Sequence, residues 1–176
     1  MNTPFSYTKS LIMILGYKIR YGSKFSTNLF QDFNRIKLEI KNSGTLIMGK
    51  HNQNRGVLHL VVDGGKMSIG SHVFFNTGAC ISCLDSITLG DRVQIANNVV
   101  IVDHDHNVAG VLSGEPHPGF TVAPISIGEN TWIGANSVIL KGTTIGKNCV
   151  IAAGSIIKGN IPDGSIIIQK RETTIK

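Results

Sequence analysis

Aliphatic residues recur at every sixth position along most of this chain, and this period constrains the fold more than any other feature. Glycine or alanine often follows the aliphatic residue, and a small or β-branched residue often stands four positions after it. A period of six matches neither the strand period of two nor the helix period of 3.6. The three aliphatic series are Ile69, Phe75, Ile81 and Ile87; then Leu89, Ile95 and Ile101; then Ile127, Ile133, Ile139, Ile145, Ile151 and Ile157.

A short strand followed by a turn accounts for this period. Three such units close a triangular coil with the aliphatic side chains pointing inward, and glycine or another small residue permits each corner. Stacked coils lie at the strand spacing of about 4.8 Å and bury their inner faces against one another. The sequence therefore predicts an all-β protein built as a parallel β-helix.

The distances between coil starts predict one long loop. Ile127 and Ile145 are 18 residues apart, whereas Ile69 and Leu89 are 20 apart, so the segment CLDSIT contains a two-residue insertion. Leu89 and Ile127 are 38 apart, and the excess lies at about residues 104–124, where GEPHPGF is typical of a loop. Long loops in compact domains are usually functional.

The rest of the chain divides around this repeat. We expect an N-terminal segment at residues 1–35, in which residues 8–20 could form a short helix. The β-helix domain is expected at residues 36–168, and a basic tail at residues 169–176. Cys80 and Cys83 form a lone C-x-x-C pair, which we interpret as small buried residues in a reducing compartment.

The formal net charge of +6 favours an anionic partner. No run of Lys and Arg is interleaved with aromatic residues, so we do not expect nucleic acid as the partner. The early apolar run LIMIL is too short to span a bilayer, and no signal peptide is visible. We therefore expect a cytoplasmic protein, and residues 5–21 could associate peripherally with the inner face of the membrane.

The motif VDHDHN, at residues 102–107, lies where the repeat stops and the long loop begins. It alternates Asp103 and Asp105 with His104 and His106. From the residues alone this motif could be a metal site, a catalytic base or a solvated turn.

The segments FFNTGACISCLDSITLGDRVQIANNVVIVDHDHN and ISIGENTWIGANSVILKGTTIGKNCVIAAGSIIKGNIPDGS resemble the hexapeptide-repeat acyltransferases. The similarity is greatest to sugar O-acetyltransferases of the galactoside and maltose type, and to enzymes that acetylate capsule or O-antigen sugars. The resemblance implies a left-handed β-helix, acetyl-CoA as the donor without a metal, and a homotrimer with active sites between subunits. The carbohydrate acceptor would carry a free hydroxyl.

The resemblance also implies roles for individual residues. Counting without gaps gives His106 as the general base, with His104 as the alternative, and an acidic residue of the family falls at or next to Asp85. Asp85, Asp103 or Asp105 could orient the base. Further candidate positions are Asn76, Trp132 and Asp103 for substrate, and Ala135, Ala153 and Lys158 for coenzyme A. The tail departs from the family pattern, and its Lys170 and Arg171 could replace the family's basic residue and contact a phosphate of coenzyme A.

Histidine suits the deprotonation of a sugar hydroxyl because it titrates near neutral pH. The alternative within the family is an N-acetyltransferase that acts on an amino sugar or a nucleotide-linked sugar. A metalloenzyme like the gamma-class carbonic anhydrases, with His104, His106 and His117 as ligands, and a non-enzymatic β-helix are the other two alternatives.

Overall fold

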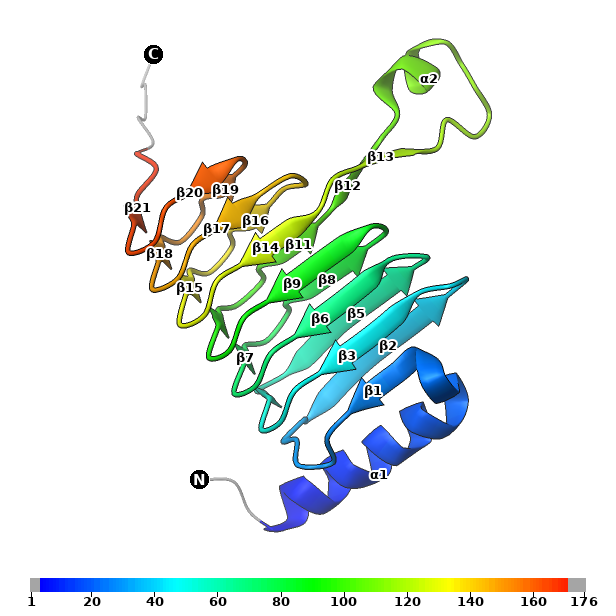
Figure 1. Cartoon of the computed structure of the whole chain (residues 1–176), viewed down its shortest axis with the longest axis vertical. Helices are drawn as coiled ribbons and strands as arrows, with labels where there is room; N and C mark the ends of the chain where they lie inside the picture. Colours follow the sequence, from blue (N-terminus) through cyan, green and yellow to red (C-terminus); the bar gives the residue numbers. More distant parts are fainter. Residues whose placement is uncertain (1–3, 171–176) are drawn as a thin grey trace, which may run out of the picture.

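The computed structural model describes residues 4–170, with side chains from Tyr7 onward. Three parallel sheets form the faces of an elongated β-helix, which confirms the predicted fold class (Figure 1). Beyond the first coil the chain visits the three sheets, here called A, B and C, in that order, so each strand of the β-helix pairs with its counterpart one coil away. The left hand implied by the resemblance stays a prediction.

The strands are short, and each sheet contains one strand per coil. Sheet A contains β1 (Phe25–Thr27), β3 (Thr45–Met48), β6 (Lys66–Ile69), β9 (Ser86–Leu89), β14 (Ile125–Ile127), β17 (Thr144–Ile145) and β20 (Asn160–Ile161). Sheet B contains β4 (Gln53–Asn54), β7 (Phe74–Phe75), β10 (Gln94–Ile95), β15 (Trp132–Ile133), β18 (Val150–Ile151) and β21 (Ile166–Ile167). Sheet C contains β2 (Arg35–Lys41), β5 (Val57–Asp63), β8 (Cys80–Cys83), β11 (Val100–Val102), β16 (Val138–Ile139) and β19 (Ile156–Ile157).

The six-residue series form the core, as the period predicts. All thirteen residues of the three series are at most 3% exposed. In the regular C-terminal coils, Ile127 pairs with Ile145, Ile133 with Ile151 and Ile139 with Ile157, each pair one coil apart. The core is therefore three columns of aliphatic side chains along the axis of the β-helix.

The sequence predicts that the glycine after the aliphatic residue permits a corner of the coil. It is needed instead because the next coil leaves no room for a side chain. At Gly128 the backbone φ is not positive, but an added Cβ would lie 2.5 Å from the carbonyl carbon of Gly146 in the next coil. The left-handed corner conformation is instead adopted by Asn130, Asn136 and Asn148, with φ of 57°, 58° and 55°. Asparagine tolerates this region better than other residues with side chains.

Both ends of the β-helix are capped. Helix α1 (Pro4–Tyr21) lies across the N-terminal end and is followed by a short 3-10 helix, η1 (Gly22–Lys24) (Figure 1). The hydroxyl groups of Tyr17 and Tyr21 donate to the carbonyls of Ile36 and Leu38 in β2, at 2.7 and 2.8 Å. At the other end, the Gln169 amide bonds both main-chain groups of Ile156. These contacts cover sheet edges that would otherwise attract another strand.

The helix agrees with the expectation for residues 8–20. The first strand of the β-helix, β1, begins at Phe25 and pairs with β3, so the parallel architecture starts before residue 36. Neither helix in the described part of the chain is long and apolar enough to cross a bilayer.

The predicted loop leaves the corner between sheets C and A. Its base is a neck of two antiparallel strands, β12 (His104–His106) and β13 (Phe120–Val122), and its tip carries helix α2 (Val108–Leu112). Figure 1 shows the loop projecting well away from the stacked coils.

Candidate active site

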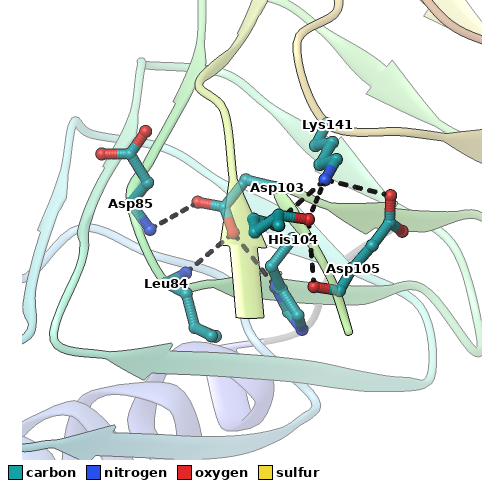
Figure 2. A network of polar contacts seen from close by, with 7 residues as sticks. Leu84, Asp85, Asp103, His104, Asp105 and Lys141 are labelled. Carbon is teal, nitrogen blue, oxygen red and sulfur yellow. Dashed lines mark hydrogen bonds and ion pairs between the residues drawn. The ribbon is translucent and has the colours of Figure 1, made fainter. Parts of the chain in front are cut away.

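The neck of the loop is fixed by a buried carboxylate. Asp103 follows β11, where strand alternation turns its side chain inward, and it is fully buried. Its carboxylate oxygens accept hydrogen bonds from the backbone N–H groups of Leu84 and Asp85, both at 2.8 Å (Figure 2). These two amides belong to the widened turn produced by the two-residue insertion. Asp103 therefore joins the root of the loop to the preceding coil.

The same carboxylate contacts His104. Nδ1 of His104 lies 3.1 Å from Oδ1 of Asp103, and the imidazole packs perpendicular to the ring of Phe120, with ring centroids 5.3 Å apart. The side chain of His104 is only 17% exposed. A carboxylate at one ring nitrogen fixes the orientation of an imidazole and favours the tautomer protonated at that nitrogen.

His106 lies on the same face of the neck but is exposed. Its ring tilts against Phe120, with centroids 4.8 Å apart, and pairs with that residue across the two strands. Phe120 therefore contacts both imidazoles. Within the described residues the side chain of His106 makes no hydrogen bond, so both ring nitrogens are open to an incoming molecule.

Lys141 holds the other side of the neck. It extends from the corner between β16 and β17 in the following coil. Its ammonium group lies 3.3 Å from the carboxylate of Asp105 and donates to the carbonyl of Thr121 at 3.2 Å (Figure 2). It also bonds the hydroxyl of Thr121. The neck is thus bonded to the coil on either side of it, through Asp103 and Lys141.

The cysteines do not resemble nucleophiles or metal ligands. Burial raises the pKa of the Cys80 thiol. Burial also raises the pKa of the Cys83 thiol, and the nearby charge of Asp103 raises it further. Both thiols are free and stay protonated near neutral pH. Cys83 is buried, in line with its interpretation from the sequence, whereas Cys80 is only half-buried.

The other residues implied by the resemblance lie elsewhere on the protomer. Asn76, Ala135 and Ala153 follow strands of sheet B, at the corner between sheets B and C, and Trp132 projects from sheet B with its side chain about half exposed. Lys158 is exposed at the corner between sheets C and A, one coil beyond Lys141. Of the three positions implied for substrate, only Asp103 lies at the neck, where it is buried, and the folded chain does not bring Asn76 or Trp132 to it.

Three further positions complete this comparison with the sequence. The carboxylate of Asp85 is exposed and points away from His104 in Figure 2, while its main-chain N–H bonds Asp103. Lys170 is exposed, and Arg171 lies outside the described residues. No cluster of three or more His, Cys, Asp or Glu side chains suited to a metal occurs between residues 4 and 170.

Sequence reasoning did not identify Phe120 or Lys141. Phe120 is the aromatic residue just before the chain rejoins the β-helix, and Lys141 occupies a turn directly after an inward isoleucine and a leucine. Phe120 contacts the two histidines because β12 pairs with β13, and Lys141 reaches the neck because its coil stacks on the loop's coil. Neither the pairing nor the stacking leaves a local motif in the sequence.

Comparisons with known proteins agree with this architecture. The family described as "Hexapeptide repeat of succinyl-transferase" matches residues 66–102 and 124–158. A putative lipopolysaccharide biosynthesis O-acetyl transferase of Escherichia coli, WbbJ, is 29% identical over 143 residues, which cover 76% of this chain and 72% of WbbJ. The galactoside O-acetyltransferase of the same species is 41% identical over 101 residues, which cover 56% of this chain and 48% of that enzyme.

A solved structure shows the same fold at low sequence identity. The N-acyltransferase AntD from Bacillus cereus, in complex with dTDP and 3-hydroxybutyryl-CoA, matches with a TM-score of 0.70 and 18% identity. The match covers 86% of this chain and 81% of AntD.

The chain spans about half the length of the galactoside enzyme and 37% of a probable acetyltransferase of Mycobacterium tuberculosis that is 32% identical over 112 residues. The chain thus shares its six-residue repeat and its three-sheet solenoid with the hexapeptide-repeat acyltransferases, and it is similar in sequence to sugar O-acetyltransferases of that kind.

Proposed function

We propose that this protein is an acetyl-CoA-dependent O-acetyltransferase that modifies a sugar hydroxyl of a surface polysaccharide, such as capsule or O-antigen, or of its precursor. The observation that carries the proposal is the pair of imidazoles on one face of the loop neck, which Asp103 and Lys141 bond to the neighbouring coils. Two relatives named as O-acetyltransferases, WbbJ and the galactoside enzyme, support hydroxyl rather than amine as the acceptor.

His106 is proposed as the general base. Its ring is exposed where a bulky acceptor can reach it, and its position is the one given by the sequence match. In the reaction, His106 takes the proton of the acceptor hydroxyl as the oxygen bonds to the thioester carbonyl carbon. The C–S bond then breaks, and the sulfur of coenzyme A leaves with that proton as a free thiol. Positioned base catalysis of this kind typically contributes about 10²–10⁴-fold in rate.

His104 is the competing assignment, because it is the histidine that contacts a carboxylate. With His106 as the base, Asp103 and His104 are positioning residues that hold the neck and the ring of Phe120. Two single variants separate these assignments. His106→Ala should lower kcat by about 10²-fold or more, and His104→Ala should lower it less. Near-normal turnover of His106→Ala, with loss of turnover in His104→Ala, would transfer the role of base to His104.

The acceptor positions on the sheet B side are explained by a neighbouring subunit. Asn76 and Trp132 lie on a different side of the protomer from the neck, so we propose a homotrimer in which they approach the neck of an adjacent chain and contact the acceptor. Ala135 and Ala153 would contact coenzyme A through the main chain, and Lys158, Lys170 and Arg171 would contact its phosphates. Cationic side chains are suited to phosphate because they offer charge and hydrogen-bond donors together.

The direct test is release of free thiol from acetyl-CoA in the presence of candidate acceptors. The acceptors should include sugars, nucleotide sugars and oligosaccharides, together with amino sugars in which only the amine is free. Release stimulated by hydroxyl acceptors and abolished in His106→Ala supports the proposal. Release with amine acceptors alone would make the protein an N-acetyltransferase, and no stimulated release from any hydroxyl acceptor would overturn the proposal.

A further inference from the structure

Helix α1 has two apolar faces, although the β-helix can cover only one of them. Ile14, Tyr17 and Tyr21 face the end of the β-helix, where Ile14 is buried and the two tyrosine hydroxyls bond β2. A second apolar set lies on the opposite side of the helix. Its members each precede one of the first three residues by two positions, which corresponds to a rotation of about 200° around the helix. They are Ile12, Leu15 and Ile19. Their exposed fractions are 67%, 42% and 86%. They form a continuous apolar stripe on the outer face of the helix.

The charge beside this stripe is mostly positive. Lys9 and Lys18 flank it on the helix, Arg20 and Lys24 lie at its end, and no acidic residue precedes Asp32. On the adjacent strand β2, the side chains of Lys37, Glu39 and Lys41 point outward, and Glu39 is paired with Lys41 at 2.9 Å. A groove between α1 and β2 is lined by Arg20, Lys37 and Lys41 among others. The end of the molecule is therefore both apolar and strongly cationic.

We infer that the outer face of α1 docks onto an anionic phospholipid surface, with Ile12, Leu15 and Ile19 in the acyl boundary and the surrounding cations among the phosphates. A helix with an apolar stripe and flanking Lys and Arg lies in the plane of such an interface, with its apolar face about 5–10 Å deep. Each nearby cation adds attraction to anionic lipid.

A second copy of the chain fits this face poorly. Two copies packed stripe to stripe would place Lys9, Lys18 and Arg20 of one chain close to those of the other, and like charges at an interface oppose association. An anionic bilayer offers the complementary charge together with an apolar layer. The inference does not depend on acetyl transfer, because none of these residues belongs to the proposed active site.

The test is flotation of the full chain with vesicles. We expect binding to vesicles of phosphatidylglycerol and phosphatidylethanolamine, little binding to pure phosphatidylcholine, and a decrease in binding as salt is raised from about 50 to 500 mM. The double substitution Ile12→Gln/Ile19→Gln should lower vesicle partitioning by about tenfold or more, because two exposed apolar side chains no longer enter the bilayer. Lys9→Gln/Lys18→Gln should lower partitioning to the anionic vesicles alone.

The matched control is Ile166→Gln/Ile168→Gln, which removes two similarly exposed isoleucines from the opposite end of the β-helix. This variant should float like the parent chain. The inference is overturned if the parent chain does not float with anionic vesicles, or if the two double isoleucine variants lose binding equally. It is also overturned if light scattering without vesicles shows self-association that Ile12→Gln/Ile19→Gln abolishes, because a second copy would then occupy the stripe.

Discussion

At the scale of single residues, Asp103 decides whether the loop is held in place. A buried carboxylate without partners would be costly, but this one accepts two main-chain hydrogen bonds and contacts His104. The two-residue insertion in the preceding coil provides those amides. One acidic side chain thus compensates for an irregular turn and orients an imidazole at the same time.

Replacement of this carboxylate should therefore destabilise the fold. Asp103→Ala leaves the N–H groups of Leu84 and Asp85 without acceptors in the interior, and we expect a loss of about 2–5 kcal/mol in the free energy of unfolding. Asp85→Ala is the control, since it removes an exposed carboxylate and keeps the N–H, and should change stability by less than about 0.5 kcal/mol. Urea denaturation of both variants measures the difference. Similar stability for the two would show that the buried carboxylate is not structural.

The thiol of Cys83 offers a second residue-scale prediction. Burial and the neighbouring Asp103 raise its pKa, and the side chain is fully buried. Because only the thiolate reacts with a disulfide reagent, Cys83 should stay unmodified in the native protein at pH 8 and react once urea unfolds the chain. Mass spectrometry of the labelled peptides identifies the modified cysteine. Fast native labelling of Cys83, compared with a surface cysteine introduced as Ser113→Cys, would contradict the buried environment.

The sequence predicted the inward residues well and the site only in part, and the difference has a physical cause. A core column repeats every six residues, so Ile133 and Ile139 could be assigned from spacing alone. The contact between Asp103 and the turn at Leu84 depends on which coils are neighbours and on how an insertion alters the register. Phe120 and Lys141 meet the neck only through antiparallel pairing and stacking, so no local pattern identifies them.

At the scale of elements, the neck behaves as a small antiparallel hairpin attached to a rigid parallel scaffold. Two isolated strands are marginally stable in water, so the neck needs support from outside. The preceding coil supplies it through Asp103, and the following coil supplies it through Lys141. We therefore expect the position of the two histidines to depend on both contacts.

Loss of the second contact should loosen the loop without unfolding the protein. Lys141→Met removes the bonds to Asp105 and Thr121, and we expect faster proteolytic cleavage within residues 107–119 and a lower kcat. Since partly exposed ion pairs contribute little, the free energy of unfolding should change by less than about 1 kcal/mol. Lys147→Met is the control, because it breaks the exposed pair with Glu129 far from the neck. Equal cleavage rates in the two variants would show that Lys141 does not hold the loop.

At the scale of the whole molecule, the β-helix separates the residues that the proposed reaction requires. The histidine neck leaves the corner between sheets C and A, whereas Asn76 lies at the corner between sheets B and C. The rigid stacked coils make a large rearrangement within one chain costly, because it would open the aliphatic core. We therefore expect assembly of identical chains to bring one chain's neck to another chain's sheet B.

This arrangement predicts complementation between two inactive variants. If His106 of one subunit and Asn76 of its neighbour form one site, then His106→Ala and Asn76→Ala should each be impaired, and a mixed trimer of the two should regain activity. In a mixed cyclic trimer of either composition, one of the three sites combines both intact residues, so the purified mixed trimers should show about a third of the parent activity. Co-expression with two different affinity tags, followed by tandem purification and the thiol-release assay, provides the measurement. Mixed trimers without regained activity would place both residues in a single subunit's site, and a monomeric mass in solution would remove the basis for a shared site.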